Sequence, residues 1–347
     1  MVAAGKGGPT MKVGLINPPK GNNVRGVGYY IDHLYEALKQ KNIDVSRIDY
    51  SLFAISYNPF DIIHFPYFSP FFLDGSFALL YPFAFSKKIV VTVHDLTPLK
   101  FPEHFPLGKR AKIVWPIQKN ALKLVNAICT DSECSRRDIT EITGVGDINV
   151  TYLAADCAFK PIKDVKKLKS IKVKYSLPNR FAMYLGGANW NKNLPTLIRA
   201  CDKIKMPLIL VGKELMGQGA DFSNIENQPL KFVIDSGAIK LGFVPDEDLV
   251  ALFNLASVYV QPSYYEGFGL PVLQAMAVGT PVICGKVGSL PEIAGEAATY
   301  VDITSVDKLA LAIKNVKKTG CEIAQTKKFS WDKTATETIK IYETILR

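Results

Sequence analysis

The chain has 347 residues, 48% of them hydrophobic and 21% charged, so it exceeds one ordinary domain and has the composition of a soluble globular protein. Its formal net charge of +10 favours an anionic partner, but no recognised nucleic-acid-binding motif accompanies that charge, which argues against DNA or RNA. No uncharged apolar run reaches the roughly 18 residues of a membrane-spanning helix, and the six cysteines lack paired C-x-x-C spacing, which predicts reduced thiols.

The first ten residues, MVAAGKGGPT, contain no apolar core of a signal peptide, and we expect them to form a loose extension outside the fold. Beyond them, four short apolar runs are typical of strands: 11–17, 61–65, 88–95 and 126–132. The first run leads through the Gly-containing segment PPKGNNVRGVG into Tyr30, Leu34 and Leu38, whose spacing of four predicts a helix. After the last run, Ser135 and Asp138 resemble a capping box at the start of another helix.

Two segments then stand out by composition. Residues 160–180 hold eight basic and one acidic side chain, which indicates either an anionic partner, such as a phosphate or a membrane surface, or a solvated helix with its lysines outward. Residues 52–85 carry twelve aromatic side chains and several prolines. They predict either a loop that contacts a hydrophobic acceptor or a membrane, or a packed cap over the sheet edge.

A second series of strand-like runs follows the basic segment, at 181–187, 206–212, 258–262, 280–285 and 298–302. A helical pattern over 330–346 closes the chain. Strands that alternate with helices predict parallel, doubly wound sheets. We therefore predict an α/β protein of two Rossmann-like domains that face each other across a cleft.

The stretch PSYYEGFGLPVLQAMAVG, which begins at residue 262, contains the best candidate for a ligand site. Pro271 suits the first position of a helix and Gly279 the position just after its end, so a short helix is expected over 271–278. Free amides at the start of such a helix can hold a diphosphate, and glycines allow its close approach. The amides in question belong to Phe268, Gly269 and Leu270.

Two polar side chains flank these amides. Glu266 comes just before the turn and Gln274 one helical turn after it, so both are expected within reach of sugar or ribose hydroxyls. The alternative interpretation is a capped helix with a solvated glutamate.

This stretch resembles the C-terminal signature of the group 1 (family four) retaining glycosyltransferases, which have the GT-B fold. Further segments resemble other motifs of that family: RGVGYYIDHL, VVTVHDLTPLKFPEHFP, TDSECSRRDI, YLGGANWNKNLPTLI and LGFVPDEDLVALFNLASVYVQPS. The resemblance implies an N-terminal acceptor-side domain over 11–158 and a C-terminal nucleotide-sugar-binding domain over 159–329. The terminal helix, 330–347, is expected to pack back toward the N-terminal domain.

The resemblance also implies roles for single residues. Glu266 would hold hydroxyls of the donor sugar, Lys192 would neutralise phosphate charge, and His94 would lie against the donor sugar. Taken alone, His94 at the end of a strand could equally be a structural residue.

Backbone groups complete the implied donor site. The amides of Phe268, Gly269 and Leu270 would hold the diphosphate. Gly26 and Gly28 would let the donor approach the N-terminal loop, and the backbone at Phe243 and Val244 would meet the base.

Two positions depart from the family pattern. Gln274 stands where the family usually has its second glutamate, a ribose-binding residue, so we expect nucleotide binding about tenfold weaker, since a neutral hydrogen bond is the weaker one. Gly187 stands where many members have an arginine on the phosphates, which leaves more charge to Lys192.

The resemblance implies transfer of a hexose, guessed as mannose from GDP-mannose, to a glycan or lipid-linked acceptor, without a cofactor or metal. We expect a cytoplasmic protein, and the basic and aromatic segments favour peripheral contact with the inner face of a membrane. Two alternatives remain: a catalytically weakened glycosyltransferase-like binding subunit, and another GT-B enzyme such as a sugar-nucleotide epimerase or a phosphorylase.

Overall fold

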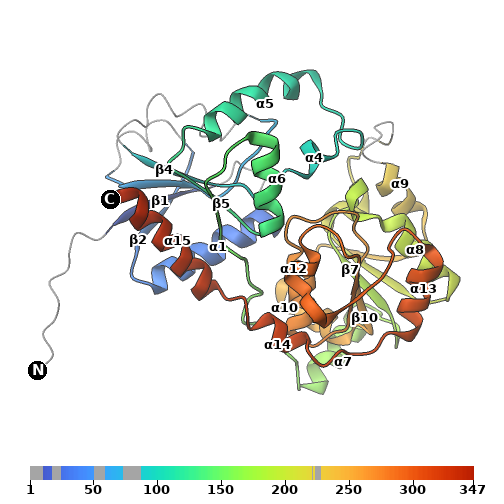
Figure 1. Ribbon diagram of the computed structural model, residues 1–347. Coiled ribbons are helices and arrows are strands. Elements are labelled where there is room, and N and C mark those ends of the chain that lie inside the picture. The colour runs from blue at the N-terminus through green and yellow to red at the C-terminus, as the bar shows by residue number, and fades with distance from the viewer. Residues whose placement is uncertain (1–10, 18–24, 51–58, 73–86, 221, 223–227) are drawn as a thin grey trace, which may run out of the picture. The chain divides into compact units, whose positions relative to one another are not determined.

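The computed structural model describes residues 11–17, 25–50, 59–72, 87–220, 222 and 228–347 (Figure 1). The chain forms two compact units, one of Met1–Leu153 with Ser330–Arg347 and one of Ala154–Phe329. The first unit ends a few residues before the boundary that we expected at 158/159, and the terminal helix belongs to it.

The first unit is built on a six-stranded parallel sheet in the order β2-β1-β3-β4-β5-β6. Its strands are β1 (Lys12–Ile16), β2 (Asp44–Ile48), β3 (Ile62–Phe65), β4 (Lys88–Thr92), β5 (Ala127–Thr130) and β6 (Ile148–Val150). Its described helices are α1 (Arg25–Gln40), α4 (Thr97–Lys100), α5 (Lys109–Leu122), α6 (Glu133–Thr143) and α15 (Trp331–Leu346). The last helix of the chain, α15, runs along the first, α1 (Figure 1).

A buried polar chain fastens α15 to this sheet. The hydroxyl of Tyr342 in α15 lies 2.6 Å from Nδ1 of His64 in β3, and Nε2 of His64 lies 2.8 Å from Oγ1 of Thr92 in β4. Burial lowers the pKa of His64 to about 3, so its ring is neutral at pH 7. The C-terminal helix is therefore held in the core of the N-terminal unit by specific hydrogen bonds.

The second unit contains another six-stranded parallel sheet, in the order β12-β11-β10-β7-β8-β9. Its strands are β7 (Ala182–Leu185), β8 (Leu208–Val211), β9 (Ile239–Gly242), β10 (Val258–Gln261), β11 (Val282–Cys284) and β12 (Ala298–Tyr300). Its α-helices are α7 (Val165–Lys174), α8 (Leu194–Lys203), α9 (Gln228–Asp235), α10 (Asp246–Leu255), α11 (Leu270–Ala277), α12 (Leu290–Ala294), α13 (Val306–Asn315) and α14 (Glu322–Thr326).

Side chains of this sheet enter two separate cores. Along β7, Met183 and Leu185 belong to one hydrophobic cluster, and Ala182 and Tyr184 to the other. Because successive side chains of a strand point to opposite faces, the sheet has a hydrophobic core on each face. The predicted α/β class with two doubly wound parallel sheets is confirmed.

All nine strands predicted from apolar runs are present, and the terminal helix begins at Trp331 as expected. Three strands were not predicted, β2, β6 and β9, and each lies at an edge of its sheet. The predicted capping box at Ser135 and Asp138 is wrong. Ser132 caps α6 instead, because its extended backbone lets its hydroxyl accept from the amide of Ser135 at 3.0 Å.

The structure describes the basic segment, residues 160–180, but only part of the aromatic segment, residues 52–85. The basic segment contains α7, whose lysines are mostly exposed, in keeping with a solvated helix. Of the aromatic segment, residues 52–58 and 73–85 lie outside the described residues. Within the described part of the chain, no helix has the length and apolar character needed to cross a membrane.

Candidate active site

The candidate site lies where the order of strands in the second unit reverses, between β7 and β10. In open parallel sheets, ligands bind beyond the carboxyl ends of the strands at such a point. Gly186 and Gly187 directly follow β7, and Ser263 and Glu266 follow β10.

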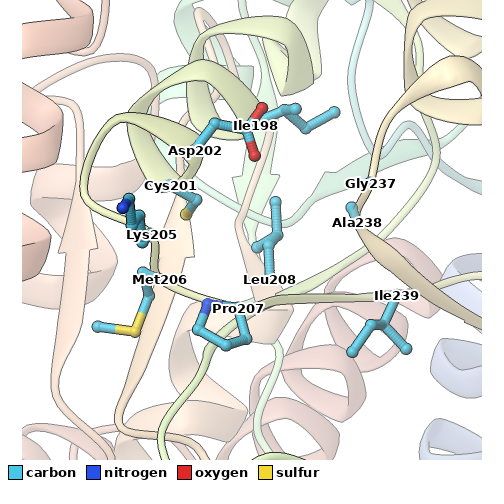
Figure 2. A pocket seen from close by; sticks show the side chains of 10 residues that line it. All are labelled: Ile198, Cys201, Asp202, Lys205, Met206, Pro207, Leu208, Gly237, Ala238 and Ile239. Atoms are coloured by element: carbon cyan, nitrogen blue, oxygen red, sulfur yellow. The ribbon is translucent and has the colours of Figure 1, made fainter.

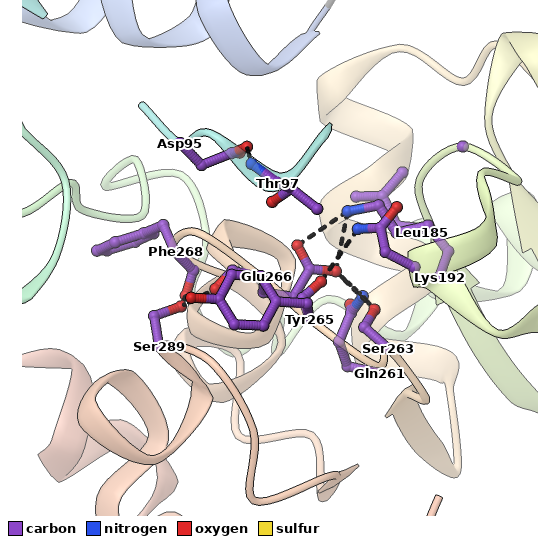
Figure 3. Close-up of polar contacts among 12 residues, drawn as sticks. Asp95, Thr97, Leu185, Lys192, Gln261, Ser263, Tyr265, Glu266, Phe268 and Ser289 are labelled. Carbon is purple, nitrogen blue, oxygen red and sulfur yellow. Dashed lines mark hydrogen bonds and ion pairs between the residues drawn. The ribbon is translucent and has the colours of Figure 1, made fainter. Parts of the chain in front are cut away.

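Figure 3 shows hydrogen bonds and an ion pair that converge on the carboxylate of Glu266 at this point. It is only 8% exposed, so the alternative of a solvated glutamate is wrong. Its Oε1 accepts from Ser263 Oγ at 2.6 Å, Gln261 Nε2 at 2.8 Å and Lys192 Nζ at 2.9 Å. Among the described residues, its Oε2 accepts only from Lys192, at 2.8 Å, which leaves that oxygen with capacity for a further donor.

The backbone of Glu266 is fixed as well. Ser289 donates to its carbonyl oxygen through the amide at 3.1 Å and through the hydroxyl at 3.0 Å. Gly288 lies so close that a Cβ there would be 2.6 Å from the same carbonyl oxygen, and its φ of +55° also favours glycine. Main chain and side chain of Glu266 are thus both held before any ligand binds.

Sequence reasoning singled out Lys192 but missed Gln261 and Ser263, which also donate to the Glu266 carboxylate. Gln261 donates from Nε2 to Glu266, and its Oε1 accepts from the hydroxyl of Tyr259 at 2.5 Å. Both side chains are buried, and burial raises the pKa of Tyr259 well above its ordinary value. The available signal was the pair of polar residues, Gln261 and Ser263, at the end of a strand that is otherwise apolar.

Lys192 reaches this carboxylate from the turn after β7, where it ends the short 3₁₀ helix η2 (Trp190–Lys192). The neighbouring Asn191 fixes that turn against the Glu266 loop, because its side chain donates to the carbonyl of Tyr265 at 3.0 Å. An ammonium group has three protons, of which the bonds to Glu266 use two. The third remains available to a phosphate oxygen.

The start of α11 has the features expected of a diphosphate site. Gly269 caps this helix with a φ of +92°, and a Cβ there would lie 2.7 Å from Leu290 Cδ2. In the described part of the chain, the amides of Phe268, Gly269 and Leu270 donate to no turn, loop or cap acceptor. Phe268 and Gly269 are buried, however, so their amides are less accessible to a ligand than we expected.

The other donor-site candidates of this unit vary in environment. Gln274 is 5% exposed, and its side chain has no hydrogen-bond partner among the described residues. Beyond β9, Phe243 is exposed whereas the side chain of Val244 is buried in the core, so only the backbone of Val244 can meet a base.

Gly187 is next to an acid. A Cβ at this position would lie 2.7 Å from Oε2 of Glu214, an exposed residue of the 3₁₀ helix η3 (Lys213–Met216). An arginine at position 187 would therefore lie next to the carboxylate of Glu214, which would compete with a phosphate for its guanidinium group.

In the first unit, His94 follows β4 and is held at both ring nitrogens. Nδ1 lies 2.6 Å from Oδ2 of Asp131, and Nε2 lies 3.1 Å from the carbonyl oxygen of Pro66. Burial lowers the pKa of His94, but the carboxylate of Asp131 and the Pro66 carbonyl raise it by more, so the net shift is upward. The structure favours an imidazolium, which can donate to both oxygens. Sequence reasoning missed Asp131.

Gly26 and Gly28 lie in the first turn of α1, not in the loop that we expected. The amide of Gly26, the second residue of α1, has no helical acceptor and remains a donor for a ligand, whereas Gly28 is the fourth residue and its amide is the first that helical bonding uses.

The cavity shown in Figure 2 is a different feature of the second unit. It has a volume of about 430 Å³ and includes Pro207 and Leu208 at the start of β8 and Ala238 and Ile239 at the start of β9. It therefore lies at the amino ends of the strands, opposite the ends where ligands bind such sheets. Among the described residues, no cluster of three or more His, Cys, Asp or Glu side chains could hold a metal ion.

The fold is that of the GT-B glycosyltransferases. Sucrose-phosphate synthase from Thermosynechococcus elongatus superposes with a TM-score of 0.74 at 19% identity, over 97% of this chain and 99% of that chain. Anabaena Alr3699/HepE, solved in complex with UDP and glucose, superposes with a TM-score of 0.70 at 16% identity, over 96% of this chain and 99% of that chain.

Sequence comparison identifies the family. Residues 166–330 match the model of "Glycosyl transferases group 1", and residues 47–159 match that of "Glycosyltransferase Family 4". O-antigen chain mannosyltransferase B of Escherichia coli is 32% identical over 279 residues, which are 74% of this chain and 70% of that protein. The chain therefore belongs to the group 1, family 4 glycosyltransferases, and it is an enzyme of that class.

Serotype-specific mannosyltransferase WbdA of Escherichia coli is also similar. It is 29% identical over 206 residues, which are 56% of this chain but only 25% of that protein.

Proposed function

We propose that the chain is a retaining hexosyltransferase that transfers mannose from GDP-mannose to a glycan or lipid-linked acceptor. Support for mannose comes from the names of its Escherichia coli relatives, an O-antigen chain mannosyltransferase and a serotype-specific mannosyltransferase. In this proposal the acceptor belongs to an envelope polysaccharide or a glycolipid.

The observation that carries the proposal is the state of the Glu266 carboxylate. In the part of the chain that the structure describes, three donors occupy Oε1 whereas Oε2 has a single partner, so Oε2 is the atom that can accept from a sugar hydroxyl. The side chain is held at the carboxyl end of β10, beside the strand-order reversal. A carboxylate held in place in this way can recognise a sugar without reorganising.

The departing nucleotide is the second chemical requirement. Breakage of the bond between the anomeric carbon and the diphosphate places negative charge on the leaving group, and preorganised donors stabilise such charge best. In the proposed site these donors are the amides of Phe268, Gly269 and Leu270 and the third proton of Lys192. These groups supply the stabilisation that a metal ion would otherwise provide, so we propose metal-independent transfer.

His94 is the second proposed catalytic residue. Both of its ring nitrogens face acceptor oxygens, so neither offers a lone pair for proton abstraction. We therefore propose that His94 acts on the donor sugar through its positive charge and not as a general base.

The experiment is a donor screen with purified protein. Nucleotide release from GDP-mannose, UDP-glucose and related donors is measured with and without glycan acceptors, for the native chain and for Glu266→Ala. We expect release from one donor and its loss in the variant. If no donor is cleaved and Glu266→Ala changes nothing, the catalytic proposal fails and the weakened binding subunit is the better account.

A further inference from the structure

A second carboxylate, that of Glu214, borders the turn that leads from β7 to Lys192. Glu214 lies in η3, which follows β8, and a Cβ at Gly187 would lie 2.7 Å from its Oε2. Its side chain is exposed and makes no ion pair or hydrogen bond in the described part of the chain. One carboxylate of this region, Glu266, is thus neutralised by a lysine, whereas the other has no such partner among the described residues.

Backbone packing holds η3 against this turn. A Cβ at Gly212, just before η3, would lie 2.2 Å from the carbonyl oxygen of Gly186, so the two segments meet main chain to main chain. Leu215 of η3 is fully buried, and its amide donates to the carbonyl of Gly212 at 3.1 Å. The turn itself is held by the hydroxyl of Tyr184, which donates to the carbonyl of Gly187 at 2.8 Å. The carboxylate of η3 therefore stays beside the turn, whichever rotamer its side chain adopts.

Glu214 and Glu266 both act on the hydroxyl of Tyr184, at the carboxyl end of β7. Burial raises the pKa of Tyr184 well above its ordinary value, and the nearby Tyr259, Glu266 and Glu214 add to the shift. The two carboxylates are thus within electrostatic reach of the same hydroxyl. The field of Glu214 therefore extends into the region where the proposed function places the diphosphate.

A carboxylate in that position distinguishes the donor from the product by charge. It repels a diphosphate, and the repulsion grows with the negative charge of the phosphate groups. In the donor the terminal phosphate carries the sugar, whereas in the released nucleoside diphosphate that phosphate is free and gains negative charge at neutral pH. The acid therefore disfavours the product more than the donor. Such a difference matters because product release limits the turnover of many enzymes.

We propose that Glu214 lowers the affinity of the site for the nucleoside diphosphate product relative to the sugar-nucleotide donor, and so promotes product release. The inference rests on the proposed function, because it takes Lys192 and the start of α11 as the diphosphate site. Glu214 is in this role a specificity-determining residue and not a catalytic one, since it acts through its charge and contacts no reacting atom.

Calorimetry with ligands of increasing charge tests the inference on the full chain. Guanosine, GMP and GDP, and the uridine counterparts, are titrated into the native chain and into Glu214→Gln. We expect the variant to bind the diphosphate about threefold to tenfold more tightly, the monophosphate less so, and the nucleoside unchanged. GDP-mannose, whose terminal phosphate carries the sugar, should gain less than GDP. High salt should reduce these differences, because it screens exposed charges.

The matched control is Glu343→Gln, which removes the same charge from an exposed position on α15 and should bind every ligand like the native chain. Thermal unfolding shows that both variants are folded. The inference is overturned if Glu214→Gln binds the diphosphate no more tightly, or if nucleoside, monophosphate and diphosphate change equally, which would place the side chain on the nucleoside. If the native chain binds none of these nucleotides, the proposed function itself fails, and the inference fails with it.

Discussion

The two units hold their key polar residues in contrasting ways. In the second unit, a chain of hydrogen bonds runs from the hydroxyl of Tyr259 through the side chain of Gln261 to the carboxylate of Glu266. In the first unit, Asp131 pairs with His94 through Oδ2, but its buried Oδ1 has no hydrogen-bond partner in the described structure.

This difference indicates different roles for the two sites. A fully paired buried network is rigid, whereas a buried polar atom without a partner costs stability until water or a ligand pairs with it. We therefore expect Glu266 to be preformed for the donor sugar, and the surroundings of His94 and Asp131 to respond when a ligand or water enters.

The largest effect is expected from Glu266→Gln. The change removes the negative charge that accepts from Lys192 and, in our proposal, from the sugar, so kcat/KM for sugar transfer should fall roughly 100-fold. Affinity for GDP should change little, because the proposed sugar contact is absent from GDP. Steady-state kinetics and calorimetry measure the two, and Glu343→Gln, at an exposed glutamate of α15, is the control. Equal losses for sugar transfer and GDP binding would contradict a role at the sugar.

Gln261→Met tests whether preformation matters. The side chain keeps its approximate shape but loses the donor to Glu266 and the acceptor for Tyr259. We expect about a tenfold loss of sugar transfer, unchanged GDP affinity, and a free energy of unfolding lower by about 1 to 3 kcal/mol. Kinetics and denaturant unfolding provide the measurements. A loss of stability without a change in transfer rate would reduce Gln261 to a structural residue.

Gln274→Glu tests whether residue 274 contacts the ribose of the nucleotide. A carboxylate should accept more strongly from ribose hydroxyls, so GDP or UDP should bind up to about tenfold more tightly in calorimetry. Because Gln274 is nearly buried and its side chain has no partner among the described residues, the new charge should lower the melting temperature of the free protein, and lower it less with nucleotide bound. Unchanged or weaker nucleotide binding would remove this residue from the ribose site.

The smallest effect concerns pH. The pKa of His94 is raised above its ordinary 6.5, so the stability from its protonated form is present below that pH and is lost as pH rises through the folded-state value. Each unit of the upward shift is worth about 1.4 kcal/mol. Asp131→Asn should flatten the decline in unfolding free energy above pH 6.5, measured by denaturant titration. An identical pH dependence in the variant would contradict the charged pair.

Whether the sequence predicts a strand depends on how much apolar surface that strand buries. The nine predicted strands are marked by apolar runs. The edge strands β2 (DVSRI), β6 (INV) and β9 (IKLG) are short or carry polar residues, and therefore resemble loops.

The features of the candidate site also differ in whether the sequence could predict them. The Gly-containing start of α11 and Glu266 belong to one contiguous segment, so the sequence could indicate them. The ion pair of Lys192 with Glu266 joins residues 74 positions apart, and His94 and Asp131 are 37 positions apart, so both pairings depend on strand order.

A crystal structure with the sugar nucleotide selected by a thermal-shift screen tests the central claim most directly. The account predicts the diphosphate within hydrogen-bond distance of the amides of Phe268, Gly269 and Leu270, and a sugar hydroxyl on Oε2 of Glu266. A ligand bound elsewhere, with those amides and that oxygen still without a partner, would contradict it.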